Sequence, residues 1–438
     1  MDTYAVKPVF SGRFRQIPLS VRVPGSKSIT NRALMIAALA DGTTLLRGAQ
    51  FSSDAQHFMQ CLKDLGFSVE DDRRAQTVLV RGEAGRIPKE EASINVGSAG
   101  TAARFLTAML AFSQGTWHLD SSEQMRHRPM AALLDALTGL GCGITPEGEP
   151  GHFPFTIHGG RITASGVTVN IDQSSQFLSA LLMAGVLTDH DFDVHAAGTH
   201  GLAYTSMTMA MMQAFGADVT NTGRTYHIPG SAAYKCREEY EIEPDVSAAA
   251  YFYGLAAISG ESVTVQGVHP DSLQGDIRFL DVLVQMGCSM KDTPEGIRLT
   301  GPVAGRLHGI DIDMHAFSDQ ALTLAAIAPY ADAPVTIRGI GHIRGQECDR
   351  MAAITQELGR MGIRTQAGSD EITIWPGQPQ PALVQTYHDH RVAMAFALTG
   401  LRSPGIVIGD PDCCRKTFAD YFAVLDGVCR QITGDAGT

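Results

Sequence analysis

Residues 61–69 read CLKDLGFSV, an amphipathic stretch that reaches a glycine and continues with alternating apolar residues. A glycine after a helix can adopt the left-handed conformation, which closes the helix and turns the chain into a strand. The pattern occurs five times at intervals of 75, 75, 71 and 75 residues. Its glycines are Gly66, Gly141, Gly216, Gly287 and Gly362. A weaker sixth copy, which places Gly427 near the C-terminus, extends the predicted repeat to six units.

A second series runs in step with these glycines. Six segments open with polar residues and continue as stretches rich in Ala, Leu and Met that are apolar nearly all round. Their markers are Ser28, Thr101, Ser175, Ser247, Asp319 and His390. A helix that is apolar on every side is a buried one. We therefore predict six βαβαββ-like units, each with one buried helix and one surface helix.

The repeat predicts a mixed α/β fold with two globular domains of three units each. Residues 24–240 would form the N-terminal domain. Residues 241–438 would form the C-terminal domain, completed by strands from residues 1–23. A charged tract at residues 231–245 ends in a proline and an aspartate and would cross between the domains. Two crossings would make a hinge, a common basis for closure over ligands.

Composition excludes several classes of protein. The 438 residues carry a formal net charge of −12, so no global basic field attracts nucleic acid or an anionic membrane. The longest apolar stretches are about half the roughly 20 residues that span a bilayer. The N-terminus does not resemble a signal peptide, and the eight cysteines lack metal-site spacing. We expect a cytoplasmic protein that binds no metal.

A repeat of this kind could also form a solenoid without catalysis. Solenoid repeats, however, are usually about 20–50 residues long. Here polar and cationic residues gather at the starts of the buried helices, where backbone N–H groups are free and the helix dipole is positive. Several such ends brought together would form a site for anions.

The first two helix starts supply cations and glycines. Residues 22–34, RVPGSKSITNRAL, contain Lys27, Ser28 and Arg32 but lack the glycine spacing of a P-loop. Residues 97–106, GSAGTAARFL, contribute Gly100, where the missing side chain permits close approach of a ligand. Each segment is equally compatible with ordinary helix capping when it is considered separately.

The remaining starts add donors, cations and two carboxylates. An aspartate at a helix start, such as Asp319, is normally a cap. The full group combines an excess of cations with two acids, which suits anionic substrates and acid–base chemistry without a cofactor. Its further members are Arg128, Ser174, Ser175, Gln176, Glu347, Arg350, Arg391 and Lys416.

Seven ordered motifs resemble the 5-enolpyruvylshikimate-3-phosphate (EPSP) synthase family of enolpyruvyl transferases. They read PGSKSITNRAL, GSAGTAARFL, RHRPM, SSQFLSALLMA, ECDR, DHRVAM and KTFADYF, from Pro24 to the C-terminal helix. The resemblance implies an inside-out α/β barrel in each of two domains that close over the substrates. It also implies a monomer that transfers enolpyruvyl from phosphoenolpyruvate to the 5-hydroxyl of shikimate 3-phosphate.

The resemblance assigns roles residue by residue. Phosphoenolpyruvate would be bound by Lys27, Gly100, Arg128, Gln176, Arg350, Arg391 and Lys416. Shikimate 3-phosphate would be bound by Lys27, Ser28, Arg32, Ser174, Ser175, Gln176, Tyr204, Asp319, His342 and Gln346. Asp319 would accept the hydroxyl proton, while Glu347, together with Lys27, would protonate the methylene carbon. The product of addition would be a tetrahedral adduct that then loses phosphate.

Three positions depart from the family pattern around the substrate phosphate. Members commonly have serine at Gly201, asparagine at His342 and lysine at Gln346. A paralogue that acts on a different cyclohexene acid is therefore the alternative. The sister enzyme that acts on UDP-N-acetylglucosamine is disfavoured, because its members have Lys-Asn where this chain has Lys27-Ser28. A catalytically inactive binding protein is disfavoured by the retention of Asp319 together with Glu347.

Overall fold

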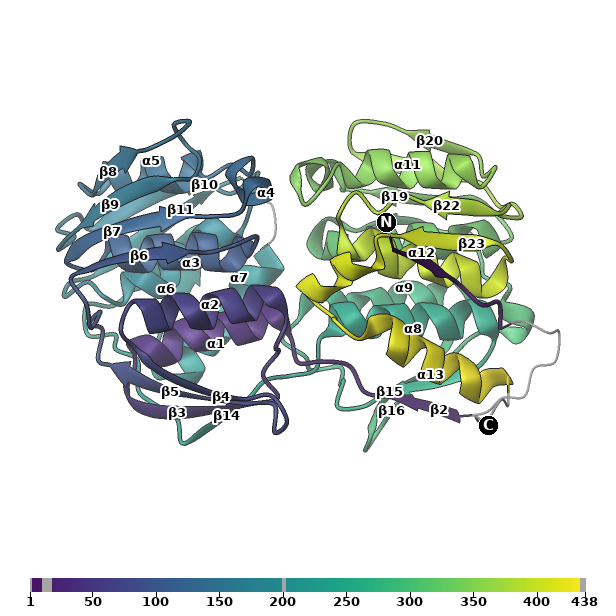
Figure 1. Cartoon of the computed structure of the whole chain (residues 1–438), viewed down its shortest axis with the longest axis horizontal. Coiled ribbons are helices and arrows are strands. Elements are labelled where there is room, and N and C mark those ends of the chain that lie inside the picture. The colour runs from purple at the N-terminus through teal and green to yellow at the C-terminus, as the bar shows by residue number, and fades with distance from the viewer. Residues whose placement is uncertain (1, 10–17, 199–201, 434–438) are drawn as a thin grey trace. The chain divides into compact units, whose positions relative to one another are not determined.

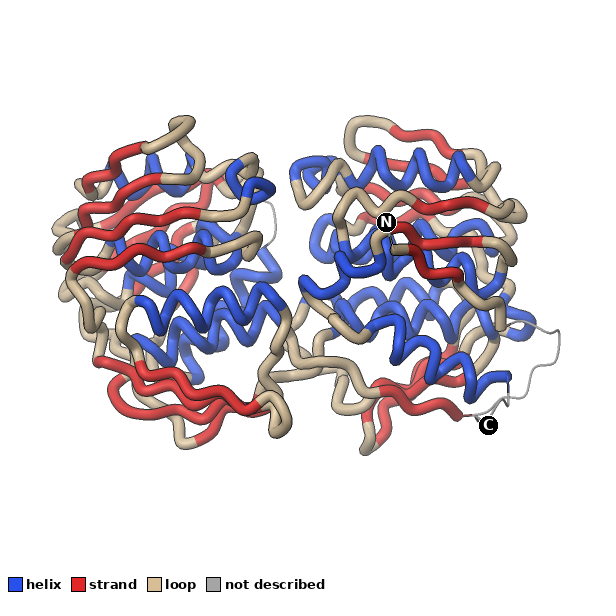
Figure 2. The backbone as a smooth tube through the Cα atoms, viewed as in Figure 1, coloured by secondary structure: helices blue, strands red, loops and turns tan. Residues whose placement is uncertain are grey.

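The computed structural model describes residues 2–9, 18–198 and 202–433. The chain divides into two compact units, Gly25–Glu243 and the described parts of Met1–Pro24 with Pro244–Thr438. Within each unit, α-helices fill the interior and short strands form the outer walls (Figure 2).

The repeated glycines close the surface helices as predicted. All five have positive φ, between 75° and 103°. In each case the second residue after the helix's final cap donates to a carbonyl five positions back, as Phe67 does to Leu62 at 3.0 Å. This is the Schellman arrangement, and it directs the chain into the next strand. The helices closed in this way are α2 (Ser53–Asp64), α5 (Ala131–Gly139), α7 (Leu202–Ala214), α9 (Phe279–Gln285) and α11 (Arg350–Arg360).

The sixth copy was predicted wrongly. Gly427 lies inside α13 (Tyr421–Thr433) and does not have a positive φ. Helix α13 continues beyond the glycine to Thr433, so residues 422–432 do not turn into a strand.

The second series forms buried helices, as expected. In α3, for example, every residue is buried. The six are α1 (Lys27–Leu39), α3 (Gly100–Ala111), α6 (Gln176–Gly185), α8 (Val246–Ser259), α10 (Ala321–Ile327) and α12 (His390–Arg402). Figure 1 shows α1, α3 and α6 in one unit and α8 and α12 in the other. Short helical turns accompany them: α4 (Glu123–Arg126), η1 (Gly275–Arg278), η2 (Val303–Gly305), η3 (His315–Gln320), η4 (Ala328–Tyr330), η5 (Gly341–Gly345) and η6 (Pro411–Lys416).

Three four-stranded sheets surround the helices of the unit Gly25–Glu243. In each, the first two strands are parallel, the third is antiparallel to the second, and the fourth is antiparallel to the third. In spatial order the first sheet is β14 (Glu239–Glu241), β3 (Asp41–Arg47), β5 (Thr77–Glu83) and β4 (Ser68–Asp72). The second is β6 (Glu91–Asn95), β7 (Gly115–Asp120), β9 (Phe155–Gly159) and β8 (Gly143–Pro146). The third is β10 (Gly166–Asn170), β11 (Phe192–Ala197), β13 (Thr225–Ile228) and β12 (Thr220–Thr222).

The other unit repeats this order twice and then shortens it. Its first sheet is β2 (Pro18–Val21), β15 (Ser262–Val265), β17 (Gly296–Thr300) and β16 (Ser289–Thr293). Its second is β18 (Asp311–Asp313), β19 (Val335–Arg338), β21 (Glu371–Ile374) and β20 (Thr365–Ala367). Its third is β22 (Ala382–Val384), β23 (Ile406–Gly409) and β1 (Thr3–Ala5), so one strand of the N-terminal segment belongs to the sheet of the last repeat.

The two crossings exchange strands between repeats. Strand β2 precedes α1 in the chain, yet it pairs parallel with β15 in the first sheet of the other unit. Conversely, β14 precedes α8 but pairs with β3. Beside the crossings, the amide of Ser26 donates to the carbonyl of Glu243 at 2.8 Å, and the amide of Asp245 donates to the carbonyl of Pro24 at 2.8 Å. Each unit is thus closed by a strand from a sequence-distant segment.

Candidate active site

In the unit Gly25–Glu243, hydrogen bonds join the three buried helices near their starts. Asn31 of α1 donates to Oγ1 of Thr101 in α3 at 2.6 Å. Arg32 of α1 reaches Oγ of Ser179 in α6 at 3.2 Å. The helix starts therefore converge within this unit, as the repeat predicts.

Arg32 is a buried cation whose hydrogen bonds go to uncharged groups. Besides Ser179, it donates to Oγ1 of Thr208 at 2.7 Å and to the carbonyl of Ser28 at 3.0 Å. Its guanidinium lies 5.1 Å from the centroid of the Phe105 ring. Burial lowers the pKa of Arg32 to about 10, which leaves it charged at neutral pH. A buried charge with neutral partners is costly, and an anionic ligand would offset that cost.

Lys27 is the first residue of α1 and lies close to a buried acid that sequence reasoning missed. Its Nζ is 3.3 Å from Oδ2 of Asp54, which is 1% exposed in the first turn of α2. The other oxygen of Asp54 has no hydrogen-bond partner among the described residues. In sequence, Asp54 follows two serines and resembles an ordinary acid at a helix start.

Gly100 begins α3 beneath two guanidinium groups. A Cβ atom at this position would lie 2.9 Å from Nη1 of Arg104 and 2.9 Å from Nη1 of Arg128. Arg104 is buried and donates to the carbonyl of Pro129 at 3.2 Å. Glycine is therefore required for close packing of these two cations on the positive end of the helix.

The start of α6 presents small polar groups. Oγ of Ser174 accepts from the amide of Gln176 at 3.2 Å, while Ser175 is buried and its side chain does not cap the helix. Oε1 of Gln176 is buried without a partner among the described residues. Tyr204 in α7 interacts electrostatically with Arg32, so it belongs to the same cluster.

In the other unit, Asp319 lies between two arginines rather than capping a helix. Its Oδ1 accepts from Nη1 of Arg350 at 3.0 Å, and its Oδ2 accepts from Nη2 of Arg391 at 2.7 Å. Asp319 is in η3, directly before α10, whose cap position is Gln320. The carboxylate is thus held by the first residue of α11 and the second residue of α12.

Arg350 connects three carboxylates. Its Nη2 donates to Oε2 of Glu347 at 2.9 Å, and its Nε donates to Oδ2 of Asp389 at 2.7 Å. Burial lowers the pKa of Arg350, but the charges of Asp389, Glu347 and Asp319 raise it by more, so the net pKa is raised. A buried arginine with this many charged partners is firmly positioned.

Lys416 completes the group from η6. Its Nζ lies 3.3 Å from Oε1 of Glu347, and both side chains are about nine-tenths buried. Glu347 is therefore paired with Arg350 on one oxygen and with Lys416 on the other. The two acids, Asp319 and Glu347, share the guanidinium of Arg350.

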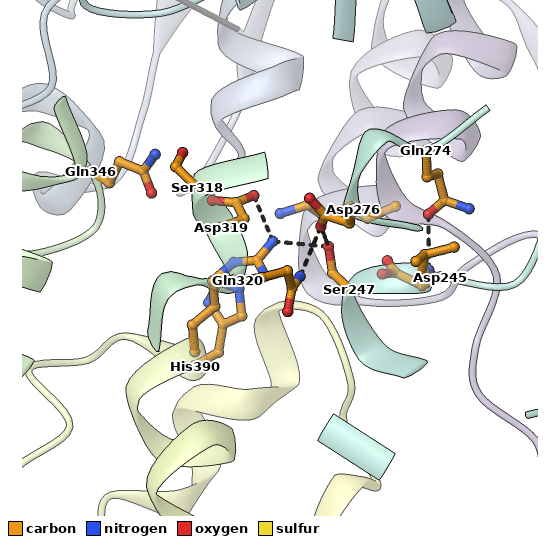
Figure 3. A network of polar contacts seen from close by, with 12 residues as sticks. Asp245, Ser247, Gln274, Asp276, Ser318, Asp319, Gln320, Gln346 and His390 are labelled. Atoms are coloured by element: carbon orange, nitrogen blue, oxygen red, sulfur yellow. Dashed lines mark hydrogen bonds and ion pairs between the residues drawn. The ribbon is translucent and has the colours of Figure 1, made fainter. Parts of the chain in front are cut away.

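A second polar network lies next to Asp319 (Figure 3). Ser247 at the start of α8 accepts from Nη2 of Arg391 at 3.3 Å and donates to Oδ2 of Asp276. Nε2 of Gln320 donates to the same carboxylate oxygen at 2.9 Å. Sequence reasoning did not identify Asp276, which is 4% exposed in η1. Only its position before a surface helix was visible in the sequence.

Two of the three positions that depart from the family pattern, His342 and Gln346, lie beside Asp319 and Arg350. Nε2 of His342 lies 2.7 Å from Oγ of Ser318. Oε1 of Gln346 accepts a hydrogen bond from Nη1 of Arg350. Gly201 lies outside the described residues.

No described helix has the length and apolar character needed to cross a bilayer. Within residues 2–9, 18–198 and 202–433, His, Cys, Asp and Glu side chains form no cluster of three that could hold a metal ion.

Comparisons with known proteins identify the family to which the chain is similar. The family model described as EPSP synthase (3-phosphoshikimate 1-carboxyvinyltransferase) matches residues 15–425. A 3-phosphoshikimate 1-carboxyvinyltransferase from Trichormus variabilis is 44% identical over 424 residues, which are 96% of this chain and 98% of the relative. One from Nostoc punctiforme is 43% identical over 410 residues, or 93% and 96% of the two chains.

Solved structures show the same fold. An EPSP synthase from Acinetobacter baumannii has a TM-score of 0.80 at 25% identity, covering 97% of this chain and 98% of that one. The enolpyruvyl transferase NikO from Streptomyces tendae has a TM-score of 0.73 at 16% identity and covers 97% and 96%, which indicates a shared fold. These neighbours confirm the predicted α/β fold class, and the family match confirms the resemblance of the seven motifs.

Proposed function

This chain belongs to the EPSP synthase family, and we propose that it transfers enolpyruvyl from phosphoenolpyruvate to the 5-hydroxyl of shikimate 3-phosphate, releasing phosphate. The reaction is a step in aromatic amino acid biosynthesis. The observation that best supports it is the sharing of Arg350 by Asp319 at 3.0 Å and Glu347 at 2.9 Å. One guanidinium holds both acids, which places two groups capable of proton transfer close together.

The chemistry follows from these two carboxylates. Asp319 accepts the proton of the 5-hydroxyl group. At the same time the oxygen of that hydroxyl group bonds to the central carbon of phosphoenolpyruvate. Glu347, assisted by Lys27, delivers a proton to the methylene carbon, which becomes a methyl group. The tetrahedral adduct then returns a methyl proton to the Glu347 carboxylate as the bond between the central carbon and the phosphate oxygen breaks, and the departing phosphate takes the proton held by Asp319. The arginines stabilise the charge that develops during both steps.

Substrate binding changes the partners of the acids. Arg350, Arg391 and Lys416 are the cations assigned to phosphoenolpyruvate, and they are ion-paired here with Asp319 or Glu347. An anionic substrate that draws these cations to itself leaves the two carboxylates less stabilised as anions. Asp319 then becomes a stronger base, and Glu347 can take up the proton that it must donate.

The proposed substrate-binding residues are the following. For phosphoenolpyruvate we assign Lys27, Gly100, Arg128, Gln176, Arg350, Arg391 and Lys416. For shikimate 3-phosphate we assign Lys27, Ser28, Arg32, Ser174, Ser175, Gln176, Tyr204, Asp319, His342 and Gln346. The buried charge of Arg32 and the cation pair above Gly100 support these assignments, because both favour anionic ligands.

Phosphate release tests the proposal. Purified protein is given phosphoenolpyruvate with shikimate 3-phosphate or with unphosphorylated shikimate. Release with the phosphorylated acid alone is expected. If a protein shown by circular dichroism to be folded releases no phosphate with either acid, the proposed substrate is contradicted.

A paralogue that acts on another cyclohexene acid is the second candidate. The observation behind it is that Gln346, where members commonly have lysine, binds Arg350 through its amide oxygen. A lost charge-assisted bond to the substrate phosphate would cost about 1.5–3 kcal/mol. The 44% identity to a named 3-phosphoshikimate 1-carboxyvinyltransferase over 96% of the chain favours the first candidate.

We also propose that the two units are domains joined by a hinge at the crossings near Pro24 and Glu243, and that the protein acts as a cytoplasmic monomer without a cofactor. The paired backbone hydrogen bonds of Ser26 and Asp245 support two adjacent connections. Small-angle scattering tests closure and mass together. A smaller radius of gyration with both substrates, at monomer mass, is expected.

A further inference from the structure

Asp276 is a buried carboxylate to which the proposed reaction assigns no role. It is the second residue of η1, follows the cap residue Gln274, and is 4% exposed. Strand β15 ends at Val265, before η1, so Asp276 belongs to a segment separate from the helix starts that carry the site.

Two hydrogen-bonded paths lead from Asp276 to Asp319 (Figure 3). In the first, Ser247 donates to Asp276 and accepts from Arg391, whose Nη2 also donates to Asp319 at 2.7 Å. In the second, Nε2 of Gln320 donates to Asp276 at 2.9 Å, and Gln320 is the residue that follows Asp319. The hydrogen bonds from Ser247 and Gln320 are accepted by the same oxygen, Oδ2 of Asp276.

The charges around the pair come from several elements. Arg350 of α11 and Arg391 of α12 face Asp319. Next to Asp319, Ser318 contacts His342 of η5, and on the side of η1 the guanidinium of Arg278 stacks 5.3 Å from the Phe317 ring centroid.

Asp276 and Asp319 repel each other. Burial, followed by the charge of Asp319, raises the pKa of Asp276 to about 6, while Arg391 and the donors Ser247 and Gln320 oppose the rise. Two carboxylates beside one guanidinium influence each other's protonation, so removing either charge favours the ionised form of the other.

We propose that Asp276 is a positioning residue for this transferase: through Ser247 and Arg391 it orients Asp319, and its negative charge keeps Asp319 a stronger base. The inference rests on the proposed function. A base that accepts a hydroxyl proton works best when its proton affinity suits the operating pH. Asp276 supplies that adjustment without contacting a substrate.

The pH dependence of turnover tests this role. Asp276→Asn preserves shape and removes the charge, and Asp281→Asn, at an exposed position in the adjoining α9, is the matched control. In D276N the acid limb of the kcat profile is expected to move to lower pH by roughly one unit, with KM for both substrates nearly unchanged. D281N should follow the wild type. If the acid limb of the kcat profile of D276N does not move, the proposal is overturned. This holds even if kcat is lower at every pH, because a uniform fall without a shift indicates a structural role.

A second variant covers poor folding of D276N. Ser247→Ala keeps the Asp276 charge but removes the link to Arg391. We expect kcat to fall about tenfold with little change in KM, because orientation of the base is lost. A kcat equal to that of the wild type overturns the proposal.

A double-mutant cycle separates this inference from the proposed activity. Unfolding free energies of wild type, D276N, D319N and the double variant are measured at pH 8 and pH 5. Non-additivity at pH 8 that shrinks at pH 5, where Asp276 has gained its proton, supports the coupling even if the wild type releases no phosphate. Additive effects at both pH values overturn it even if the enzyme is active.

Discussion

Oδ2 of Asp319 accepts a 2.7 Å hydrogen bond from Nη2 of Arg391. The aspartate is assigned to the hydroxyl proton and the arginine to phosphoenolpyruvate. The pair therefore connects the base to the binding of the other substrate. In the proposed assignment, Asp319 and phosphoenolpyruvate would compete for the same guanidinium.

Replacement of Asp319 should separate binding from turnover. In Asp319→Asn, kcat is expected to fall about 10²–10⁴-fold, the usual contribution of a general base. The affinity for phosphoenolpyruvate, measured by calorimetry with shikimate 3-phosphate present, should stay equal or rise, because a competing carboxylate is gone. Near-normal turnover would remove Asp319 from the proposed chemistry.

Two of the buried arginines, Arg350 and Arg32, are predicted to affect stability to different extents. Arg350→Met leaves buried carboxylates without their cation and should lower the free energy of unfolding by about 3–5 kcal/mol. Arg32→Met breaks hydrogen bonds to neutral partners, so its effect should stay within about 1 kcal/mol. Urea denaturation at pH 7.5 measures both. If Arg32→Met lost more stability than Arg350→Met, the conclusion that Arg32 has only uncharged hydrogen-bond partners would be contradicted.

Gly100→Ala should weaken phosphoenolpyruvate binding without unfolding the protein. Its Cβ would displace the guanidinium groups of Arg104 and Arg128, each 2.9 Å away. We expect KM for phosphoenolpyruvate to rise about tenfold, the cost of misplaced cations. Gly139→Ala in α5 is the control, since its Cβ meets nothing within 4 Å. Equal KM values in the two variants would mean that the cation pair does not bind this substrate.

The raised pKa of Asp276 predicts how stability depends on pH. Its folded pKa is about 6 and its ordinary value is 3.8, so the folded state binds the proton more tightly. This favours folding below about pH 4 and is lost as pH rises through 6. The stability of D276N relative to wild type should therefore increase by up to about 3 kcal/mol between pH 4 and pH 7. Urea unfolding across that range measures the difference; a flat or falling difference contradicts it.

The repeat and its helix starts could be predicted because both depend on local chemistry. Glycine at the end of a surface helix dictates a left-handed turn, and five such turns formed as expected. The prediction that Gly427 closes a helix was wrong, because an isolated glycine can remain inside a helix at a cost of about 1 kcal/mol when packing favours the helix. Residues 434–438 lie outside the described residues.

The partners of the site residues could not be predicted. Asp276 and Asp54 are separated from Asp319 and Lys27 by tens of residues, and an acid near a helix start ordinarily acts as a cap. The exchange of β2 and β14 between sheets also depends on long-range pairing, which no local pattern encodes. Asp319 itself was more typical of a cap until two arginines were seen to bind it.

Deuterium transfer tests the shared role of Asp319 and Glu347 most directly. The wild type is incubated in D₂O with phosphoenolpyruvate and shikimate 3-phosphate, and the methylene group of the product is examined by mass spectrometry. Addition and elimination pass through a methyl group, so deuterium should appear in the product, and Glu347→Gln should suppress both product and label. Product formed by the wild type without deuterium would contradict protonation of the methylene carbon and the assignment of Glu347.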